Sequence, residues 1–287
     1  MRKIFRKEYG ALDFMTEWHN VPMLKGIEHL HIMPYLCAYQ HGLKEEEDPV
    51  FFLVVEYAQA TLEDFLGGGN SNIFRSSQDL WRQIQGVMEA LEELHRNGLF
   101  HLDLKPQNLL VVDGVLKIAD FGIARFIEGK SRPYEARQTA KSARIDYRQS
   151  IYAPPESVRA SQQLDLFSMG GIFSETACQD ISGGNSVEEY RKNRLEEDRP
   201  AYFCRSTFHY NGQVKESVKE EHTKLLALIK TGGVDGEHRP IDPWQRRFYS
   251  EDLFALFASM LTPWEDKEIT TQAVVEKLTE KRILAEI

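Results

Sequence analysis

The stretch that decides the fold is His101-Leu102-Asp103-Leu104-Lys105-Pro106-Gln107-Asn108, together with Asp120-Phe121-Gly122 further along the chain. Five fixed residue types at this fixed spacing are expected by chance about once in a million start positions at average composition. Carboxylates, an amide and a lysine that lie close together in the sequence can bind phosphates and divalent cations. The pattern therefore predicts a chemical site rather than an ordinary polar loop.

The residues between the two stretches predict a tight β-hairpin. Two short apolar runs, residues 109–112 and 115–118, are joined by Asp113-Gly114, a pair favoured in two-residue turns. Because paired strands lie about 4.8 Å apart, the hairpin returns Asp120 to the neighbourhood of Asn108. An amide oxygen and a carboxylate placed together are hard oxygen ligands, which suit Mg²⁺ held against substrate phosphates.

The two stretches resemble the catalytic loop and the Asp-Phe-Gly motif of protein kinases, and the resemblance covers the chain from about residue 50 to its end. It implies that Asp103 orients the substrate hydroxyl and accepts its proton. It also implies that Lys105 contacts the γ-phosphate, as in serine/threonine kinases. Asn108 and Asp120 fall on the two magnesium-binding positions of the family. The implied cofactors are ATP and Mg²⁺.

Further family positions are matched around these stretches. His101 matches a structural histidine that packs against the Phe of Asp-Phe-Gly, here Phe121. Asp165 matches the helix-start aspartate that holds the catalytic-loop backbone. Pro154-Pro155-Glu156 stands for the Ala-Pro-Glu that closes the activation segment. The resemblance thus extends well beyond the two motifs.

Residues 50–57 form a continuous apolar run, rich in β-branched and aromatic side chains, that predicts a buried strand. By resemblance, its end is the adenine-binding hinge, with Glu56 and Ala58 at the cofactor. Two glutamates match the helix glutamate that pairs with the family's phosphate-binding lysine. Glu8 has the better leucine partner, whereas Glu17 has the better distance to the loop that follows the helix. We favour Glu17.

The front of the kinase pattern is incomplete. Neither a Gly-x-Gly-x-x-Gly loop nor a Val-Ala-Ile-Lys strand is found. Lys3 lies fourteen positions before Glu17, close to the family's separation, but we favour a surface lysine near a frayed terminus. A fragment or an incomplete gene model explains the missing strands equally well.

Leu102 replaces the arginine that precedes the catalytic aspartate in the family. That arginine pairs with a phosphate on the activation segment, and leucine has no charge with which to do so. We therefore predict that phosphorylation of the activation segment does not switch this protein through that contact. Residues 129–149 of the segment are locally basic, which favours a solvated loop or one that attracts acidic partners.

Helical periodicity dominates the remainder. From Ser76 to Gly98, apolar residues recur at three- and four-residue steps, with Ser76 and Asp79 resembling a capping box and Gly98 ending the helix. We expect further helices at 165–177, 217–229, 251–261 and 270–284, and an irregular stretch at 179–215. The expected fold is α+β and protein kinase-like, with a mainly helical C-lobe (58–287) and a reduced, β-containing partial N-lobe (1–57).

Composition sets limits on the partners. The formal net charge of −9 argues against nonspecific nucleic-acid binding. Three scattered cysteines favour a reducing compartment, so we expect a cytoplasmic protein, with the nucleus as the alternative. The longest apolar run, Leu253 to Leu261, is far short of the ~20 residues that span a bilayer, so we expect no membrane anchor.

Three functions compete. The first is a serine/threonine protein kinase that transfers the γ-phosphate of ATP to a protein substrate, which Lys105 favours over a tyrosine kinase. The second is a pseudokinase that serves as a binding or scaffolding module, as the missing glycine loop and Leu102 suggest. The third is a small-molecule phosphotransferase, and Pro154-Pro155-Glu156 argues against it.

Overall fold

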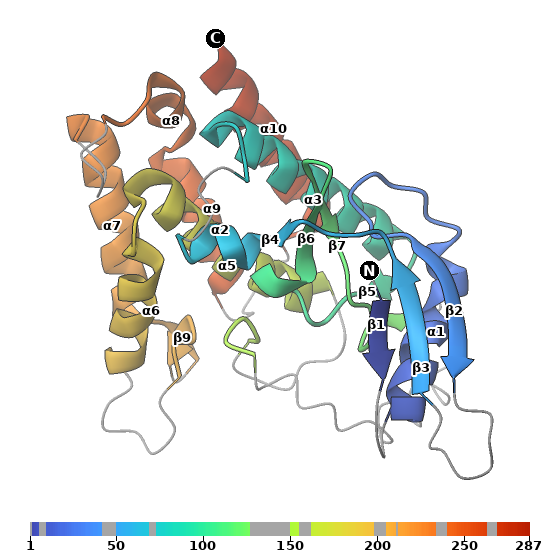
Figure 1. The fold of residues 1–287 in the computed structure, drawn as a ribbon. Coiled ribbons are helices and arrows are strands. Elements are labelled where there is room, and N and C mark those ends of the chain that lie inside the picture. Colours follow the sequence, from blue (N-terminus) through green and yellow to red (C-terminus); the bar gives the residue numbers. More distant parts are fainter. Residues whose placement is uncertain are drawn as a thin grey trace.

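The computed structural model describes residues 2–5, 10–41, 50–68, 73–126, 150–154, 162–197, 205–210, 212–233, 240–262 and 269–287, and only the backbone of residues 2–5, 10–13 and 16. A small sheet with one helix is formed by the N-terminal part of the chain, and a larger, mainly helical body contains the C-terminus (Figure 1). The expected α+β architecture with a reduced N-terminal lobe is confirmed. The division at residue 57 stays a prediction.

The N-terminal sheet has three antiparallel strands in the order β1-β3-β2, and one helix packs on it. Its elements are β1 (Arg2–Phe5), α1 (Gly10–Leu24), β2 (Tyr35–His41) and β3 (Val50–Val55). Phe14 of α1 stacks on Phe51 with ring centroids 4.8 Å apart and shares a buried cluster with Leu53. Burial of these apolar side chains fixes the helix against the sheet.

Short elements connect this sheet to the helical body. They are β4 (Ala60–Thr61), α2 (Leu62–Leu66), β5 (Leu99–Phe100), the 3₁₀ turn η1 (Pro106–Asn108), β6 (Leu109–Val112), β7 (Val115–Ile118) and β8 (Arg125–Phe126). The predicted hairpin is confirmed, strand for strand. Asp113 and Gly114 have φ of 50° and 80°, as a two-residue turn with both central residues at positive φ requires.

The helical body is built around a buried central helix, α5. Its helices are α3 (Ser77–Arg96), α5 (Gln162–Ser182), α6 (Ser186–Glu197), α7 (Glu216–Thr231), α8 (Pro243–Phe248), α9 (Glu251–Leu261) and α10 (Thr271–Glu286), with a small ribbon of β9 (His209–Tyr210) and β10 (Gln213–Val214). Trp81 of α3 packs on Phe173 of α5 and Phe257 of α9, joining three helices in one core. In the part of the chain that the structure describes, no helix has the length and apolar character needed to cross a bilayer.

The ends of α3 agree with the predicted caps in all but one bond. The Ser76 side chain accepts a hydrogen bond from Asp79 N at 3.1 Å, as an N-cap does. The Asp79 carboxylate, however, accepts from Arg75 N rather than from Ser76 N, so the capping box is only half formed. Gly98 has a φ of 75° and follows the last turn, where glycine is the residue of lowest strain. The helix therefore delivers the chain directly to His101.

The expectation of an irregular stretch at 179–215 is wrong. Helix α6 lies inside it, and only Val187, Tyr190 and Arg194 of that helix are buried. One of these three is charged, so the sequence lacks the apolar stripe by which an amphipathic helix is recognised. The buried arginine is held by polar partners instead, which no hydrophobic pattern can predict.

Acid should weaken the helical body through His222 of α7. Its Nε2 lies 2.8 Å from Ser174 Oγ, and burial lowers its pKa to about 4. In the unfolded chain His222 binds a proton below about pH 6.5, whereas in the folded chain it stays neutral down to about pH 4. Stability is therefore lost as the pH falls between these values. From about pH 7.5 to about pH 5, we expect this histidine to lower the free energy of unfolding by about 2 kcal/mol.

Urea unfolding of the wild type and of His222→Gln at both pH values measures this contribution. Glutamine keeps a nitrogen near Ser174 but does not titrate, so the variant should lose less stability on acidification than the wild type. Equal losses in the two proteins would show that other groups cause the acid sensitivity.

Candidate functional site

A buried aspartate at the start of α5, Asp165, holds the backbone that leads into Asp103. Its Oδ2 accepts from His101 N at 2.8 Å, and its Oδ1 accepts from Leu102 N at 2.7 Å. His95 Nε2 lies 2.8 Å from the same carboxylate. Leu102 has a φ of 66°, a region that residues other than glycine rarely adopt. The bonds to Asp165 hold this strained backbone in place.

Both ring nitrogens of the buried His101 are engaged. Asp103 N donates to His101 Nδ1 at 3.3 Å, and Nε2 lies 3.0 Å from the main-chain oxygen of Ala119. Because Nδ1 accepts, Nε2 carries the proton and donates to Ala119. The ring also meets Phe121 edge-on at 4.9 Å between centroids. His101 therefore links the two motifs mechanically.

Asp103, Lys105 and Asn108 are tied together by their side chains. Lys105 Nζ lies 2.7 Å from Asp103 Oδ2. Asn108 Nδ2 donates to the main-chain oxygen of Asp103 at 2.8 Å and to Asp103 Oδ2 at 3.1 Å. With its nitrogen so used, Asn108 would bind a cation through its amide oxygen. The side chains of Asp103 and Lys105 are 21% and 32% exposed, so both can meet a substrate.

The β6–β7 hairpin returns the chain to this group. Ala119 N donates to Asn108 O at 2.9 Å, and Asp120 is the next residue. Asp120 has a φ of 66°, and its Oδ1 accepts from Gly122 N at 3.3 Å. Within the described ranges, no group of three or more His, Cys, Asp or Glu side chains is placed to hold a metal. A cation here would rest on one amide, one carboxylate and ligand phosphates, as Mg²⁺ commonly does.

Helix α1 joins the site through Glu17, which is buried. Tyr35 OH donates to Glu17 Oε1 at 2.5 Å. Burial, with the nearby Glu17 carboxylate as the second cause, raises the pKa of Tyr35 well above its ordinary value, so the hydroxyl keeps its proton. Further along α1, Asn20 Nδ2 donates to the main-chain oxygens of Phe121 at 3.0 Å and Ala124 at 3.2 Å. The helix is thus bound to the Asp-Phe-Gly stretch.

The expectation of a frayed terminus around Lys3 is wrong. Residues 2–5 form strand β1, which pairs with β3 so that Lys3 lies opposite Leu53. The strand is four residues long and half charged or polar, so neither length nor alternation reveals it. Glu8 lies outside the described residues, so of the two candidate glutamates the structure places only Glu17.

An apolar cluster lies between the hinge and the hairpin. Tyr35 and Ala58 pack against its buried members, which are Met33, Val55, Leu110, Val112 and Ala119. The hinge is fixed at both sides: Glu56 Oε2 lies 3.0 Å from Lys117 Nζ of β7, and Gln59 N donates to Val111 O at 2.9 Å. Apolar side chains beside a main-chain edge suit a flat aromatic ring, because the ring is buried and its edge is hydrogen-bonded.

A family model described as the protein kinase domain matches residues 3–278 of this 287-residue chain. The chain belongs to the protein kinase family. The match begins at Lys3, which lies in strand β1, an element that the sequence pattern does not predict. The resemblance stated from the two motifs is thereby confirmed over nearly the whole chain.

Curated relatives are serine/threonine and cyclin-dependent kinases. Serine/threonine-protein kinase bur1 of Emericella nidulans is 30% identical over 242 residues, which is 75% of this chain and 44% of that protein. Cyclin-dependent kinase D-1 of Arabidopsis thaliana is 27% identical over 185 residues, 62% of this chain and 42% of that protein. Cyclin-dependent kinase 2 of Caenorhabditis elegans is 46% identical over 96 residues, 32% of this chain and 24% of that protein. The matches thus span less than half the length of each of these relatives.

Some expected kinase features lie outside the described residues. These are most of the activation segment, including the basic residues 129–149, and Pro155-Glu156. Of the segment's closing residues, Ser150 to Pro154 are described, and the Ser150 hydroxyl accepts from Tyr152 N at 3.3 Å. The statements about phosphorylation of this segment therefore stay predictions.

Several contacts that support the site are not evident from the sequence. Tyr35 is bound to Glu17 of α1, Asn20 to the backbone of Phe121, and Lys117 to Glu56. All three bonds join residues far apart in the chain, so local patterns contain no signal for them. A search for polar residues three positions from Glu17 on α1 would have found Asn20, because residues at this spacing share a helix face.

Proposed function

We propose that this chain is a protein serine/threonine kinase that transfers the γ-phosphate of ATP to a hydroxyl of a protein substrate. The observation that supports it most is the single hydrogen-bonded group of Asp103, Lys105 and Asn108, with Asp120 returned beside it by the hairpin. Phosphoryl transfer needs positioned charges and hydrogen-bonding groups more than covalent chemistry, and these four residues supply them.

The residues present fit ATP and Mg²⁺ on the chemistry of their donors. The cluster around Val55 and Leu110 would receive the adenine, with the main chain of Glu56 and Ala58 at its edge. Asn108 and Asp120 would hold Mg²⁺ by their side-chain oxygens. When bound, the ion neutralises negative charge on the phosphates.

Each of the remaining residues has a separate task. The Asp103 carboxylate would accept a hydrogen bond from the substrate hydroxyl, align it and take its proton. Lys105, now 2.7 Å from Asp103, would donate to the transferred phosphate and stabilise its developing charge. Spacing and strand register make Lys3 the candidate for the lysine that kinases pair with the helix glutamate, Glu17.

Lys105 and the relatives support the proposed substrate class and partners. Lys105 stands where serine/threonine kinases have a lysine, and one relative is named a serine/threonine-protein kinase. Two others are named cyclin-dependent kinases, so a cyclin is the first partner protein to test. We place the protein in the cytoplasm, with the nucleus as the alternative.

Thermal unfolding with ATP tests the nucleotide site directly. A ligand at one hundred times its dissociation constant stabilises the native state by about 2.7 kcal/mol, so we expect a Tm increase of about 4–5 °C with both ATP and Mg²⁺. Asp120→Asn should remove the Mg²⁺-dependent part of that increase, since it weakens one of two protein ligands. Asp113→Asn, the same change on the exposed turn of the hairpin, should not.

An absence of any shift at millimolar ATP would contradict the kinase proposal and favour the scaffold. Leu102, which replaces the arginine that precedes the catalytic aspartate in the family, already favours that alternative. A shift that is equal with and without Mg²⁺ would remove the metal roles of Asn108 and Asp120.

A further inference from the structure

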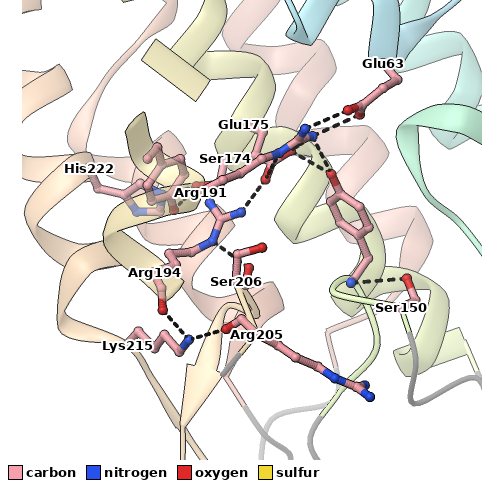
Figure 2. A network of polar contacts seen from close by, with 12 residues as sticks. Glu63, Ser150, Ser174, Glu175, Arg191, Arg194, Arg205, Ser206, Lys215 and His222 are labelled. Carbon is pink, nitrogen blue, oxygen red and sulfur yellow. Dashed lines mark hydrogen bonds and ion pairs between the residues drawn. The ribbon is translucent and has the colours of Figure 1, made fainter. Parts of the chain in front are cut away.

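Arg191 of α6 occupies a seat made of two carboxylates. It meets Glu63 of α2 with two nitrogens, Nη1 to Oε1 at 2.6 Å and Nη2 to Oε2 at 2.9 Å. It meets Glu175 of α5 with Nε at 3.1 Å and Nη2 at 2.6 Å. Figure 2 shows Arg191 between these two side chains. Paired hydrogen bonds to two carboxylates fix the position and orientation of a guanidinium, in addition to neutralising its charge.

The same guanidinium reaches the end of the activation segment through Tyr152. Arg191 Nη2 donates to Tyr152 OH at 3.0 Å, and that hydroxyl donates to Glu175 Oε2 at 2.6 Å. The Tyr152 backbone is in turn fixed to α5, since Ser168 Oγ donates to Tyr152 O at 3.0 Å. One side chain thus connects the helix after the hinge, the central helix and residues 150–154.

The electrostatics of the seat are balanced. Glu175 is fully buried and is contacted by Arg194 as well as Arg191. Burial alone raises the pKa of Glu175, but these two guanidinium groups outweigh it and hold the pKa below its ordinary value. Burial, followed by the Glu175 charge, raises the pKa of Tyr152, so its hydroxyl remains a donor. Two carboxylates and two guanidinium groups leave no net charge in the network.

We propose that Arg191 is a positioning residue: it fixes Tyr152, at the end of the activation segment, relative to α2 and the hinge, and this end forms part of the site for the peptide substrate. The proposal rests on the proposed kinase function, because it assigns residues 150–154 to substrate binding. Arg191 fills the space between Glu63 and Glu175, so its guanidinium is committed to holding these elements in order.

Two variants separate positioning from loss of fold. Arg191→Ala empties the seat, whereas Glu63→Ala leaves Arg191 on Glu175 and removes only the tie to α2. Lys192→Ala, an exposed change on the same helix, is the matched control. Backbone hydrogen exchange in the peptide that contains residues 150–154 should rise about tenfold in both test variants and stay within twofold in the control, as a loss of about 1.4 kcal/mol of local order gives.

Steady-state kinetics with a serine-containing peptide provides the second readout. We expect the KM of the peptide to rise about tenfold in both variants, with the KM of ATP changed less than twofold, because the nucleotide site is untouched. Guanidinium ion at millimolar concentration should restore the exchange rate and the peptide KM of Arg191→Ala, and sodium at equal ionic strength should not.

Unchanged exchange at residues 150–154 in both variants would overturn the proposal, whatever the kinetics show. Equal increases in the KM of ATP and of the peptide would also overturn it, because a general loosening of the fold has that effect. A wild-type chain that transfers no phosphate would remove the proposed function alone, since the exchange measurement does not depend on activity.

Discussion

Replacing Asp103 by asparagine should lower kcat for phosphoryl transfer about 10²–10⁴-fold, the range that general acid–base groups contribute. Asparagine has nearly the same shape and can still accept from Lys105 and Asn108, so the loop should keep its form. It cannot take a proton from the substrate hydroxyl. The loss should therefore fall on kcat, while the KM of ATP changes less than about threefold.

Initial rates at saturating ATP and peptide, together with the Tm of each variant, measure this effect. Asp113→Asn is the control, since it makes the same substitution at the exposed turn of the hairpin that leads away from Asn108. Its kcat should match the wild type. If Asp103→Asn keeps more than a tenth of the wild-type kcat, Asp103 is not the proton acceptor.

Replacing Gly86 by alanine should destabilise the fold by about 2 kcal/mol or more, although alanine is the better helix former by about 1 kcal/mol. A Cβ at this position of α3 would lie 2.0 Å from His31 Nε2. His31 is buried and held by a 2.7 Å bond from Nδ1 to Leu116 O, so the ring has little freedom to retreat. The backbone of His31 is also hydrogen-bonded to β7, because Ile118 N donates to His31 O at 2.8 Å.

The double variant His31→Ala/Gly86→Ala tests the cause. Without the imidazole the clash disappears, so adding Gly86→Ala to His31→Ala should be neutral or stabilising, by up to about 1 kcal/mol. Urea unfolding of the four proteins in this cycle gives the coupling between the two sites. Additive losses would show that the close approach of His31 and Gly86 is not the reason.

The motif residues and their immediate geometry could be predicted from sequence, because the constraints there are local. The hairpin of residues 109–118 has an apolar run on each side of an Asp-Gly turn, and its strands lie where the pattern places them. The long amphipathic helix that ends just before Gly98 is equally predictable, since its buried residues recur with helical spacing.

The elements that could not be predicted have their causes outside their own sequence. Strand β1 is too short to show alternation and exists by pairing with β3, about fifty positions later. Helix α6 buries a charged residue, Arg194, whose guanidinium lies over the rings of Tyr190 and Phe208 and contacts Glu175. Burial of that kind depends on partners from other elements, which no periodicity reveals.

The kinase proposal is tested most directly by incubating the chain with Mg²⁺ and ATP that is labelled in its γ-phosphate, together with peptides that contain serine, threonine or tyrosine. The residue that receives the label is then identified. We expect label on serine and threonine, dependence on Mg²⁺, and loss of label with Asp103→Asn. Label on tyrosine would contradict the substrate class. A folded wild-type chain that binds ATP and transfers no label to any peptide would contradict the central claim and leave a binding module.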